Sequence, residues 1–429
     1  MSKNVILKAP THIELTITEM CNHKCKHCYN AWREETPQND FFDKRKIDHI
    51  LDELIKYQVT YVTITGGEPL LCLDRMFYII SRLKELDIGI GLNTNLSLMT
   101  NSIAKKLKEK YHWGNTILTS LPGFTEEECD KITQVKGSLK KIENGIETCL
   151  FNNIPVGVNV VITKSNLNNL NDLLDFLERH KVSVLALTRV VPPVYDSDNS
   201  YFRLSKDDVN KMVDFLRLVK EKYKIKVTSL CSLPLCLLDK EEDMELFSTK
   251  CAAGIIACSI NGITGEVTPC AHNDISYGNI YEKSLFDIWE KMRLWRTGEY
   301  LPTECKNCKM ITACGGDCRL NALRFKNKPY QLKKIELHKY KSQENVFLLK
   351  NSITYSFNQK TVIRNEEFGA VVSLGNNEFY VTHSVKSLIL ILKNKKEFTL
   401  KDILLICELN DYMKRLLNQL LVAEIVYEV

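Results

Sequence analysis

Residues 21–28 read Cys-Asn-His-Lys-Cys-Lys-His-Cys, and this stretch decides the fold and the chemistry that we expect of the 429-residue chain. The thiols of Cys21, Cys25 and Cys28, spaced C-x3-C-x2-C, can supply three protein ligands to an iron–sulfur cluster. A cluster of four irons then keeps one iron open for a substrate or cosubstrate. A structural zinc site is the alternative, because His23 or His27 could supply the fourth ligand that zinc normally takes.

The residues before this loop predict a strand, since residues 13–18 (Ile-Glu-Leu-Thr-Ile-Thr) alternate and are rich in β-formers. A second β-rich run, Val59–Thr65, leads directly into Gly66-Gly67-Glu68-Pro69. Two glycines allow a close backbone approach, Pro69 stiffens the exit, and Glu68 offers an acceptor for an ammonium group. An ordinary turn at a strand end is the alternative interpretation of this second motif.

Together the two motifs resemble the radical S-adenosylmethionine (SAM) enzymes. The resemblance implies a [4Fe–4S] cluster on Cys21, Cys25 and Cys28, whose open iron binds SAM and whose electron cleaves SAM to a 5′-deoxyadenosyl radical. It also implies SAM contacts from the second motif and from the ends of later strands. These SAM-binding residues are Gly66, Gly67, Glu68, Pro69, Asn95, Ser120 and Asn159, with Asn93 and Thr94 as further candidates near the ribose.

The first half of the chain alternates apolar strands with helical patterns, which predicts an α/β fold with a parallel sheet. The expected strands after the first two are residues 88–94, 116–121, 156–163 and 182–189. The expected helices are residues 44–57, 75–86, 101–110, 126–151 and 168–180. Six strands fit the partial (β/α)6 TIM-type barrel of radical SAM enzymes.

The chain has 16 cysteines, no export signal and no apolar stretch of membrane-spanning length, which favours a reducing cytoplasm and metal ligation over disulfides. A dense set, Cys305-x2-Cys308-x5-Cys314-x3-Cys318, follows Cys251 and the pair Gly265-x4-Cys270. This pattern resembles the SPASM domain, which carries auxiliary [4Fe–4S] clusters; a zinc ribbon is the alternative. The segments 277–280 and 284–289 resemble the residues that usually join the two halves of that pattern.

The SPASM resemblance implies two ligand sets. The first holds Cys251, Cys270 and Cys318, with Cys258 as a candidate fourth ligand, and the second holds Cys305, Cys308 and Cys314. The usual last cysteine of the pattern is absent, since none follows until Cys407. Six cysteines outside these sets are interpreted as incidental thiols, namely Cys72, Cys129, Cys149, Cys231, Cys236 and Cys407.

The C-terminal part has a different character, with a lysine-rich linker or helix at 324–341 and then hairpin-like strands at 354–357, 361–364 and 368–380. Helical patterns follow at 384–392, 400–407 and 412–422, which indicates a small winged-helix-like α+β domain. Residues 362–370 and the helices after them resemble the peptide-binding domain of pyrroloquinoline quinone biosynthesis. Such domains bind leader peptides by β-augmentation. From residue 346 onward there are 10 Lys and Arg against 9 Asp and Glu, so nothing favours a DNA-binding surface.

The sequence therefore predicts a cytoplasmic radical SAM/SPASM peptide maturase in three domains: a barrel (1–230), a SPASM domain with linker (231–345) and a peptide-recognition domain (346–429). Its partners would be a ribosomally made precursor peptide and a reductant such as flavodoxin or ferredoxin, with no nucleic acid and no membrane. The expected product is an oxidative thioether or carbon–carbon cross-link.

Two alternatives remain open. A protein modifier similar to anaerobic sulfatase-maturating enzymes is one, although Ala271 stands where those enzymes often place an aspartate. A non-catalytic iron–sulfur sensor is the other, and a SAM-binding motif has no use in such a sensor.

Overall fold

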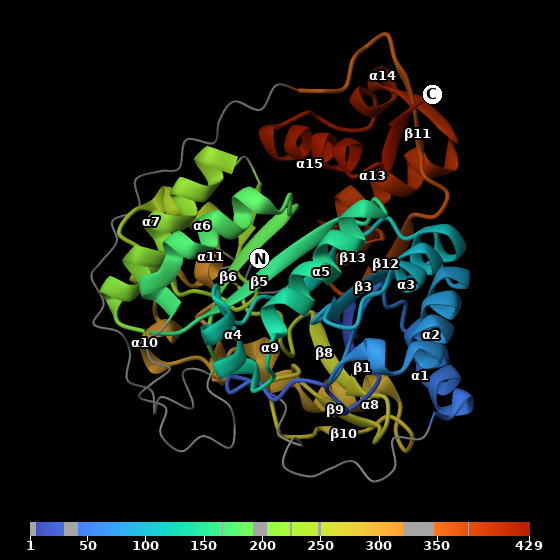
Figure 1. The fold of residues 1–429 in the computed structure, drawn as a ribbon. Helices are drawn as coiled ribbons and strands as arrows, with labels where there is room; N and C mark the ends of the chain where they lie inside the picture. Colours follow the sequence, from blue (N-terminus) through green and yellow to red (C-terminus); the bar gives the residue numbers. More distant parts are fainter. Residues whose placement is uncertain are drawn as a thin grey trace.

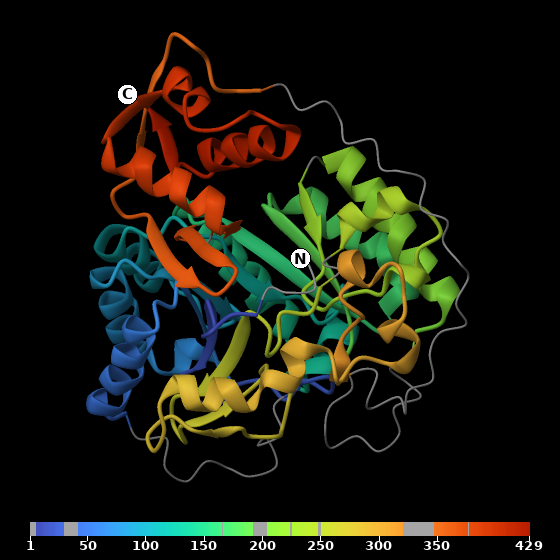
Figure 2. The same cartoon turned by 180° about the vertical axis from the view of Figure 1, so that it is seen from behind.

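The structure is a computed structural model that describes residues 6–29, 42–164, 166–191, 204–223, 225–247, 250–320, 347–375 and 377–429. The predicted linker at 324–341 lies outside these residues. Three parts follow one another along the chain, and Figures 1 and 2 show the cysteine-rich part and the C-terminal part at opposite ends of a central sheet. In the portion of the chain described, no helix is long and apolar enough to cross a membrane.

The central sheet has ten strands in the order β10-β9-β8-β1-β2-β3-β4-β5-β6-β7. The strands from β8 to β7 in this order run parallel. The six predicted strands are confirmed as β1 His12–Thr16, β2 Tyr61–Thr65, β3 Gly89–Thr94, β4 Ile117–Ser120, β5 Val156–Ile162 and β6 Val184–Arg189. The sequence did not predict β7 Lys226–Thr228 or the parallel strand β8 Ala257–Asn261.

Helices follow the strands and bury their apolar faces against the sheet (Figure 1). They are α1 Lys44–Lys56, α2 Leu73–Glu85, α3 Asn101–Lys105 continued by a π-helical turn, α4 Glu126–Thr133, α5 Ser138–Phe151, α6 Leu170–Arg179 and α7 Lys206–Tyr223. The single helix predicted over 126–151 is wrong. Gln134 and Gly137 adopt positive φ, and the Asp130 carboxylate accepts from the N–H groups of Gly137 and Ser138, which starts a new helix there.

The cysteine-rich part extends the barrel sheet and shares its hydrophobic core. Strand β8 pairs with β1, and β9 Glu266–Thr268 and β10 Gly278–Asn279 continue the sheet in antiparallel fashion. Short helices follow: α8 Leu285–Lys291, α9 Arg293–Thr297, α10 Thr303–Lys306 and α11 Ile311–Cys314. The buried Trp289 indole donates to the Leu7 carbonyl over 2.8 Å, so this part is fixed to the start of the barrel.

The C-terminal part has a hydrophobic core of its own, formed by residues between Leu349 and Val426. One small sheet has the order β12-β13-β14 and the other β15-β11-β16. The elements are β11 Thr354–Phe357, β12 Val362–Glu366, β13 Gly369–Leu374, β14 Asn377–Thr382, α13 His383–Asn394, β15 Glu397–Thr399, α14 Leu400–Leu404, α15 Asp411–Val422 and β16 Val426–Glu428. Strands followed by helices agree with the prediction, with the predicted range 368–380 forming the two strands β13 and β14. Strands β15 and β16 were missed because three residues give no detectable alternation.

A buried ion pair fixes the C-terminal part to the amino ends of the barrel strands. Arg364 is 1% exposed; it pairs with Glu366 over 2.7 Å and donates to the carbonyls of Ala9 and Pro10, both over 2.9 Å. Glu366 in turn accepts from the Lys8 N–H. A buried charge is tolerated only where such partners satisfy it, so this contact defines one docking position. The residues just before β1 form it, and they lie at the opposite end of that strand from the cysteine loop.

Candidate active site

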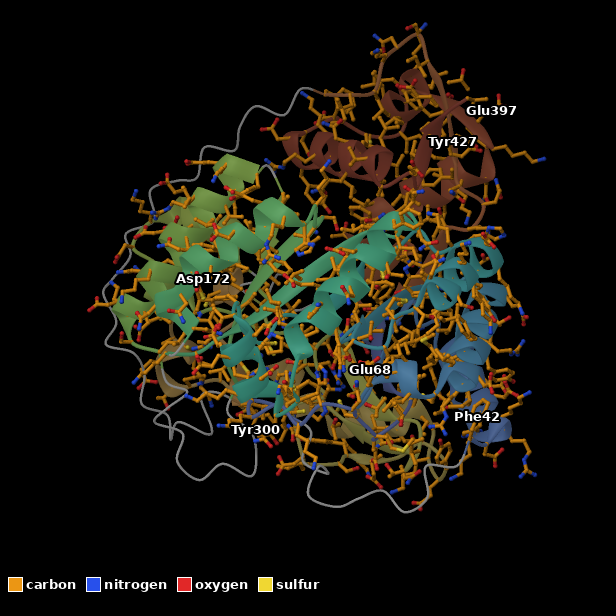
Figure 3. The ribbon with its side chains drawn as sticks, in the orientation of Figure 1. Phe42, Glu68, Asp172, Tyr300, Glu397 and Tyr427 are labelled. Atoms are coloured by element: carbon orange, nitrogen blue, oxygen red, sulfur yellow. The ribbon has the colours of Figure 1, made fainter. Side chains whose placement is uncertain are left out.

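A cavity of about 380 Å³ opens at the carboxyl ends of the barrel strands and collects most of the predicted site residues. Each of the strands β1 to β6 contributes to its wall, which requires the sheet to curve around the cavity as a partial barrel does. The lining includes Cys21, Cys25, Cys28, Gly66, Gly67, Glu68, Asn93, Thr94, Asn95, Ser120 and Asn159. Figure 3 shows Glu68 in the barrel, far from Glu397 and Tyr427 of the C-terminal part.

The cysteine loop follows β1 and is held by backbone bonds to the end of α4. The N–H groups of Lys24 and Lys26 donate to the carbonyls of Thr133 and Ile132 over 2.8 and 3.0 Å. Cys21 is exposed, while Cys25 and Cys28 are partly exposed, and all three line the cavity. The loop thus presents three thiols to one space, as a cluster with one open iron requires.

The two glycines of the second motif allow the cysteine loop to pass directly over them. The Gly67 N–H donates to the Thr18 carbonyl and the Glu68 N–H to the Met20 carbonyl, both over 2.7 Å. A Cβ atom on Gly66 would lie 2.4 Å from the Thr18 oxygen, and one on Gly67 would lie 2.0 Å from the Met20 oxygen. The glycines therefore fix the cysteine loop against the SAM-binding motif, a packing role that the sequence did not reveal.

Replacing Gly67 by alanine is expected to displace the cysteine loop and to lower the free energy of unfolding by about 1–3 kcal/mol, as overpacking in a core does. Loss of the radical-generating cluster should accompany this, measured as iron content after anaerobic reconstitution. Gly114→Ala is the matched control, because no atom lies within 4 Å of a Cβ built there. Equal iron content in both variants would contradict the close-packing argument.

Glu68 is 1% exposed, and its carboxylate joins the ends of β2 and β3. Oε1 accepts from the Thr94 hydroxyl over 2.6 Å and from the Leu70 N–H, and Oε2 accepts from the Asn95 N–H over 2.7 Å. Burial raises its pKa, and these three hydrogen bonds oppose that rise. Because a carboxylate accepts about four hydrogen bonds, roughly one acceptor position remains for a ligand ammonium group.

Asn95 is engaged with the protein rather than free for a ligand. Its amide donates to Asn22 in the cysteine loop over 2.9 Å, and its oxygen accepts from the Ser97 hydroxyl over 2.6 Å. Asn22 also donates to Ser97 over 2.9 Å, which closes a three-residue ring. Asn93, two residues earlier on β3, lines the cavity without a side-chain hydrogen bond in the described structure, so it is the better candidate for a ligand contact.

The other predicted SAM contacts also divide into residues that line the cavity and residues engaged within the protein. Ser120 is exposed at the end of β4 and lines the cavity, and Asn159 lines it from β5 while accepting from the Thr188 hydroxyl over 2.6 Å. Pro69 is buried at the first position of a 3₁₀ turn and is not among the lining residues. The prediction of Pro69 as a cofactor contact is therefore corrected to a structural role in the turn.

Three cysteines of the cysteine-rich part, Cys251, Cys270 and Cys318, line the same cavity. Cys258 does not. It lies on β8 beside Ala257, whose side of the strand lines the cavity, and successive side chains of a strand point to opposite faces. Cys258 is 1% exposed and belongs to the hydrophobic core, so its proposed role as a fourth ligand is corrected.

Cys305, Cys308 and Cys314 form a second group outside the cavity. The Cys308 N–H donates to the Cys305 carbonyl over 3.2 Å and the Cys314 N–H to the Met310 carbonyl over 2.9 Å, so tight turns keep the three cysteines in one compact segment. Gly315, Gly316 and Asp317 all adopt positive φ between Cys314 and Cys318. This left-handed run turns the chain so that Cys318 joins the cavity group rather than the second one.

A partly buried carboxylate that the sequence did not single out also faces the cavity. Glu14, in the middle of β1, accepts from the Ala271 N–H over 3.1 Å, and burial raises its pKa. The Tyr29 ring stacks on His272 with centroids 4.2 Å apart, and the Tyr29 pKa is raised first by burial and then by Glu14. The available signal was a charged residue inside an otherwise apolar strand.

The donor set fits iron–sulfur clusters better than single metal ions. Among the described residues, no group of three or more His, Cys, Asp or Glu side chains converges closely enough to hold one ion. Zinc would need four ligands within about 2.3 Å of one centre. Three thiols from one loop suit a four-iron cluster, because each thiolate can bind a different iron and leave the fourth iron open.

Comparisons with known proteins agree with this geometry. The sequence profile of the Radical SAM superfamily matches residues 15–177, and that of the SPASM iron–sulfur cluster-binding domain matches residues 251–309. The chain is 24% identical over 331 residues to the AdoMet-dependent heme synthase of Methanosarcina barkeri, covering 73% of this chain and 92% of that protein. It is 26% identical over 309 residues to the sporulation killing factor maturation protein SkfB of Bacillus subtilis, covering 70% and 69%.

Solved structures show the same fold. The structure of Streptococcus suis SuiB bound to the precursor peptide SuiA superimposes with a TM-score of 0.57 at 19% identity and covers 74% of each chain. The enzyme anSMEcpe with bound AdoMet gives a TM-score of 0.56 at 17% identity, covering 74% of this chain and 95% of that one.

Proposed function

Since this chain is a radical SAM enzyme with an auxiliary-cluster SPASM domain, we propose that it is a maturase of a ribosomally made peptide and installs an oxidative cross-link. The single observation that carries the proposal is a groove in the C-terminal part, described below, that is built to accept an extended peptide. A radical SAM enzyme that acted on a small cofactor would have no use for such a groove. The fold that this chain shares with SuiB in its peptide complex supports the same conclusion.

Different residues of the chain would bind the cluster and the different groups of SAM. Cys21, Cys25 and Cys28 would hold the [4Fe–4S] cluster, which with SAM supplies a radical able to abstract hydrogen from the substrate. Glu68 would meet the SAM ammonium group with its remaining acceptor position. Asn93 would face the ribose, and Ser120 and Asn159 would complete the contact. Glu68 itself is shielded from water, since its side chain is buried at the end of β2.

Glu14 would accept the proton that an oxidative cross-link releases. A substrate radical that forms the new bond must lose one electron and one proton, and an auxiliary cluster held by the SPASM cysteines would supply the acceptor for the electron. The Glu14 carboxylate lies in the same cavity as Cys270 and has a raised pKa, which suits a general base. The Glu14 carboxylate accepts from the N–H of Ala271. Sulfatase-maturating enzymes often carry an aspartate at the position of Ala271, so Glu14 would supply a carboxylate close to where that aspartate stands in those enzymes.

The groove lies between β14 and α15 and has a volume of about 550 Å³. In the described residues β14 pairs only with β13, so its outer edge offers backbone N–H and C=O groups to an added strand. Phe379 of β14 and Val422 of α15, the latter 75% exposed, provide apolar contacts, and Arg415 provides a positive charge. These features suit a leader peptide with apolar anchors and an acidic residue.

The expected result of Val422→Asp is a loss of about ten- to a hundredfold in peptide affinity, because an apolar anchor in an interface contributes about 1–3 kcal/mol. The probes are fluorescent synthetic peptides translated from short open reading frames beside the gene, with binding measured by anisotropy. Leu405→Asp is the control, since Leu405 is 84% exposed and lies outside the groove.

Conversion of a bound peptide tests the whole proposal. The reconstituted enzyme with SAM and reductant should lower the peptide mass by the loss of hydrogen and form 5′-deoxyadenosine. Formation of 5′-deoxyadenosine with no binding of any such peptide would overturn the peptide assignment while leaving the enzyme class intact.

A further inference from the structure

Each auxiliary group contains three of the predicted cysteines, and the segment 229–236 brings one further cysteine to each. Cys231 lines the active-site cavity together with Cys251, Cys270 and Cys318. Both Cys231 and Cys236 were interpreted as incidental thiols, because they precede the residues that resemble a SPASM pattern.

Arg189 holds Cys231 beside Cys318. Its guanidinium Nη2 donates to the Ser232 carbonyl over 3.3 Å and also pairs with the Asp317 carboxylate. Ser232 follows Cys231 in the chain, and Asp317 precedes Cys318. The Arg189 Nη2 atom therefore connects a residue adjacent to Cys231 with a residue adjacent to Cys318. Cys231 and Cys318 both line the active-site cavity, so the two thiols face one space.

Cys236 approaches the second group. The N–H of Leu235, the residue before it, donates to the Cys314 sulfur over 3.4 Å. Pro234 is extended, and a 3₁₀ turn over Leu235–Leu237 follows it, so the chain changes direction between the two cysteines.

We propose that Cys231 is the fourth ligand of the auxiliary cluster on Cys251, Cys270 and Cys318, and that Cys236 is the fourth ligand of the cluster on Cys305, Cys308 and Cys314. Cys236 thus replaces the last cysteine that the chain lacks, and Cys231 takes the role first given to Cys258. Clusters with four thiolates have no open iron, so both suit electron transfer rather than substrate binding.

The test needs neither peptide nor turnover, and it therefore fails or succeeds independently of the proposed function. It uses the full chain with Cys21, Cys25 and Cys28 replaced by alanine, so that only auxiliary clusters form. After anaerobic reconstitution this protein should hold about eight irons. Adding Cys231→Ala or Cys236→Ala should remove between about one and about four irons and change the electron paramagnetic resonance spectrum of the reduced protein.

Cys258→Ala in the same background is the matched control and should keep the iron content and spectrum, because that thiol faces the core. Unchanged iron and spectra in Cys231→Ala or in Cys236→Ala would overturn the assignment of that residue. If an alanine variant does not fold, the serine variant decides: an oxygen ligand shifts the spectrum and the reduction potential, whereas a thiol that is not a ligand leaves both unchanged.

Discussion

Replacement of Cys21, Cys25 and Cys28 by alanine is expected to reduce 5′-deoxyadenosine formation to background while the protein remains folded. The three thiols lie on a partly exposed loop, and they take no part in the backbone bonds that hold it to α4 or in the Asn22 side-chain bonds to Asn95 and Ser97. Iron content should fall from about twelve to about eight per chain, since one four-iron cluster is lost and two remain. Iron and sulfide analysis with chromatographic detection of 5′-deoxyadenosine measures both effects.

The control for this variant replaces Cys72 and Cys407, two thiols that are partly exposed and do not line the cavity. That protein should keep its iron and its SAM cleavage. Retention of 5′-deoxyadenosine formation in the triple variant would refute the assignment of the loop. Zinc bound in place of iron by the wild-type protein would refute the radical mechanism itself.

Glu14→Gln is expected to lower cross-link formation by about 10²- to 10⁴-fold, the usual contribution of a general base, while SAM cleavage changes little. Glutamine has the same size, and its oxygen can still accept from the Ala271 N–H, so the cavity wall should be preserved. The charge that receives the proton is lost. Quantifying peptide product and 5′-deoxyadenosine in the same reaction separates these two effects, because their ratio should fall.

Glu53→Gln provides the matched control for Glu14→Gln. Glu53 is a buried carboxylate that likewise accepts from a backbone N–H of the cysteine-rich part, that of Leu285 over 2.7 Å, but it lies outside the cavity. Its replacement should leave the product ratio unchanged. An equal loss of product and 5′-deoxyadenosine in Glu14→Gln would assign Glu14 to SAM binding or structure instead of proton transfer.

The strands, most helices and the first motifs could be predicted from sequence because their signals are local. The alternation in β1 and the glycines at 66 and 67 depend only on neighbouring residues. The break between α4 and α5 was missed because the Asp130 side chain replaces a helical backbone partner, which a periodicity analysis does not detect.

The parts of the site that were missed depend on contacts between distant segments. Glu14 meets Ala271, and the Leu235 N–H meets the Cys314 sulfur, across separations that no spacing rule describes. Cys258 was a candidate from the SPASM resemblance, whereas the strand pleat turns its side chain away from the cavity. Cys236 could have been suspected from the missing last cysteine, because the second group then has only three of the predicted thiols.

The docking of Arg364 at the amino ends of the barrel strands has a consequence for substrate selection. A peptide whose leader lies along β14 must pass around the barrel before its other end enters the cavity at the carboxyl ends. Because the buried ion pair fixes this span, the protein would act as a molecular ruler. The enzyme would then select the residue to modify by its distance along the peptide from the leader. Residues inserted between the leader and the modified residue would move the cross-link by the same number of positions.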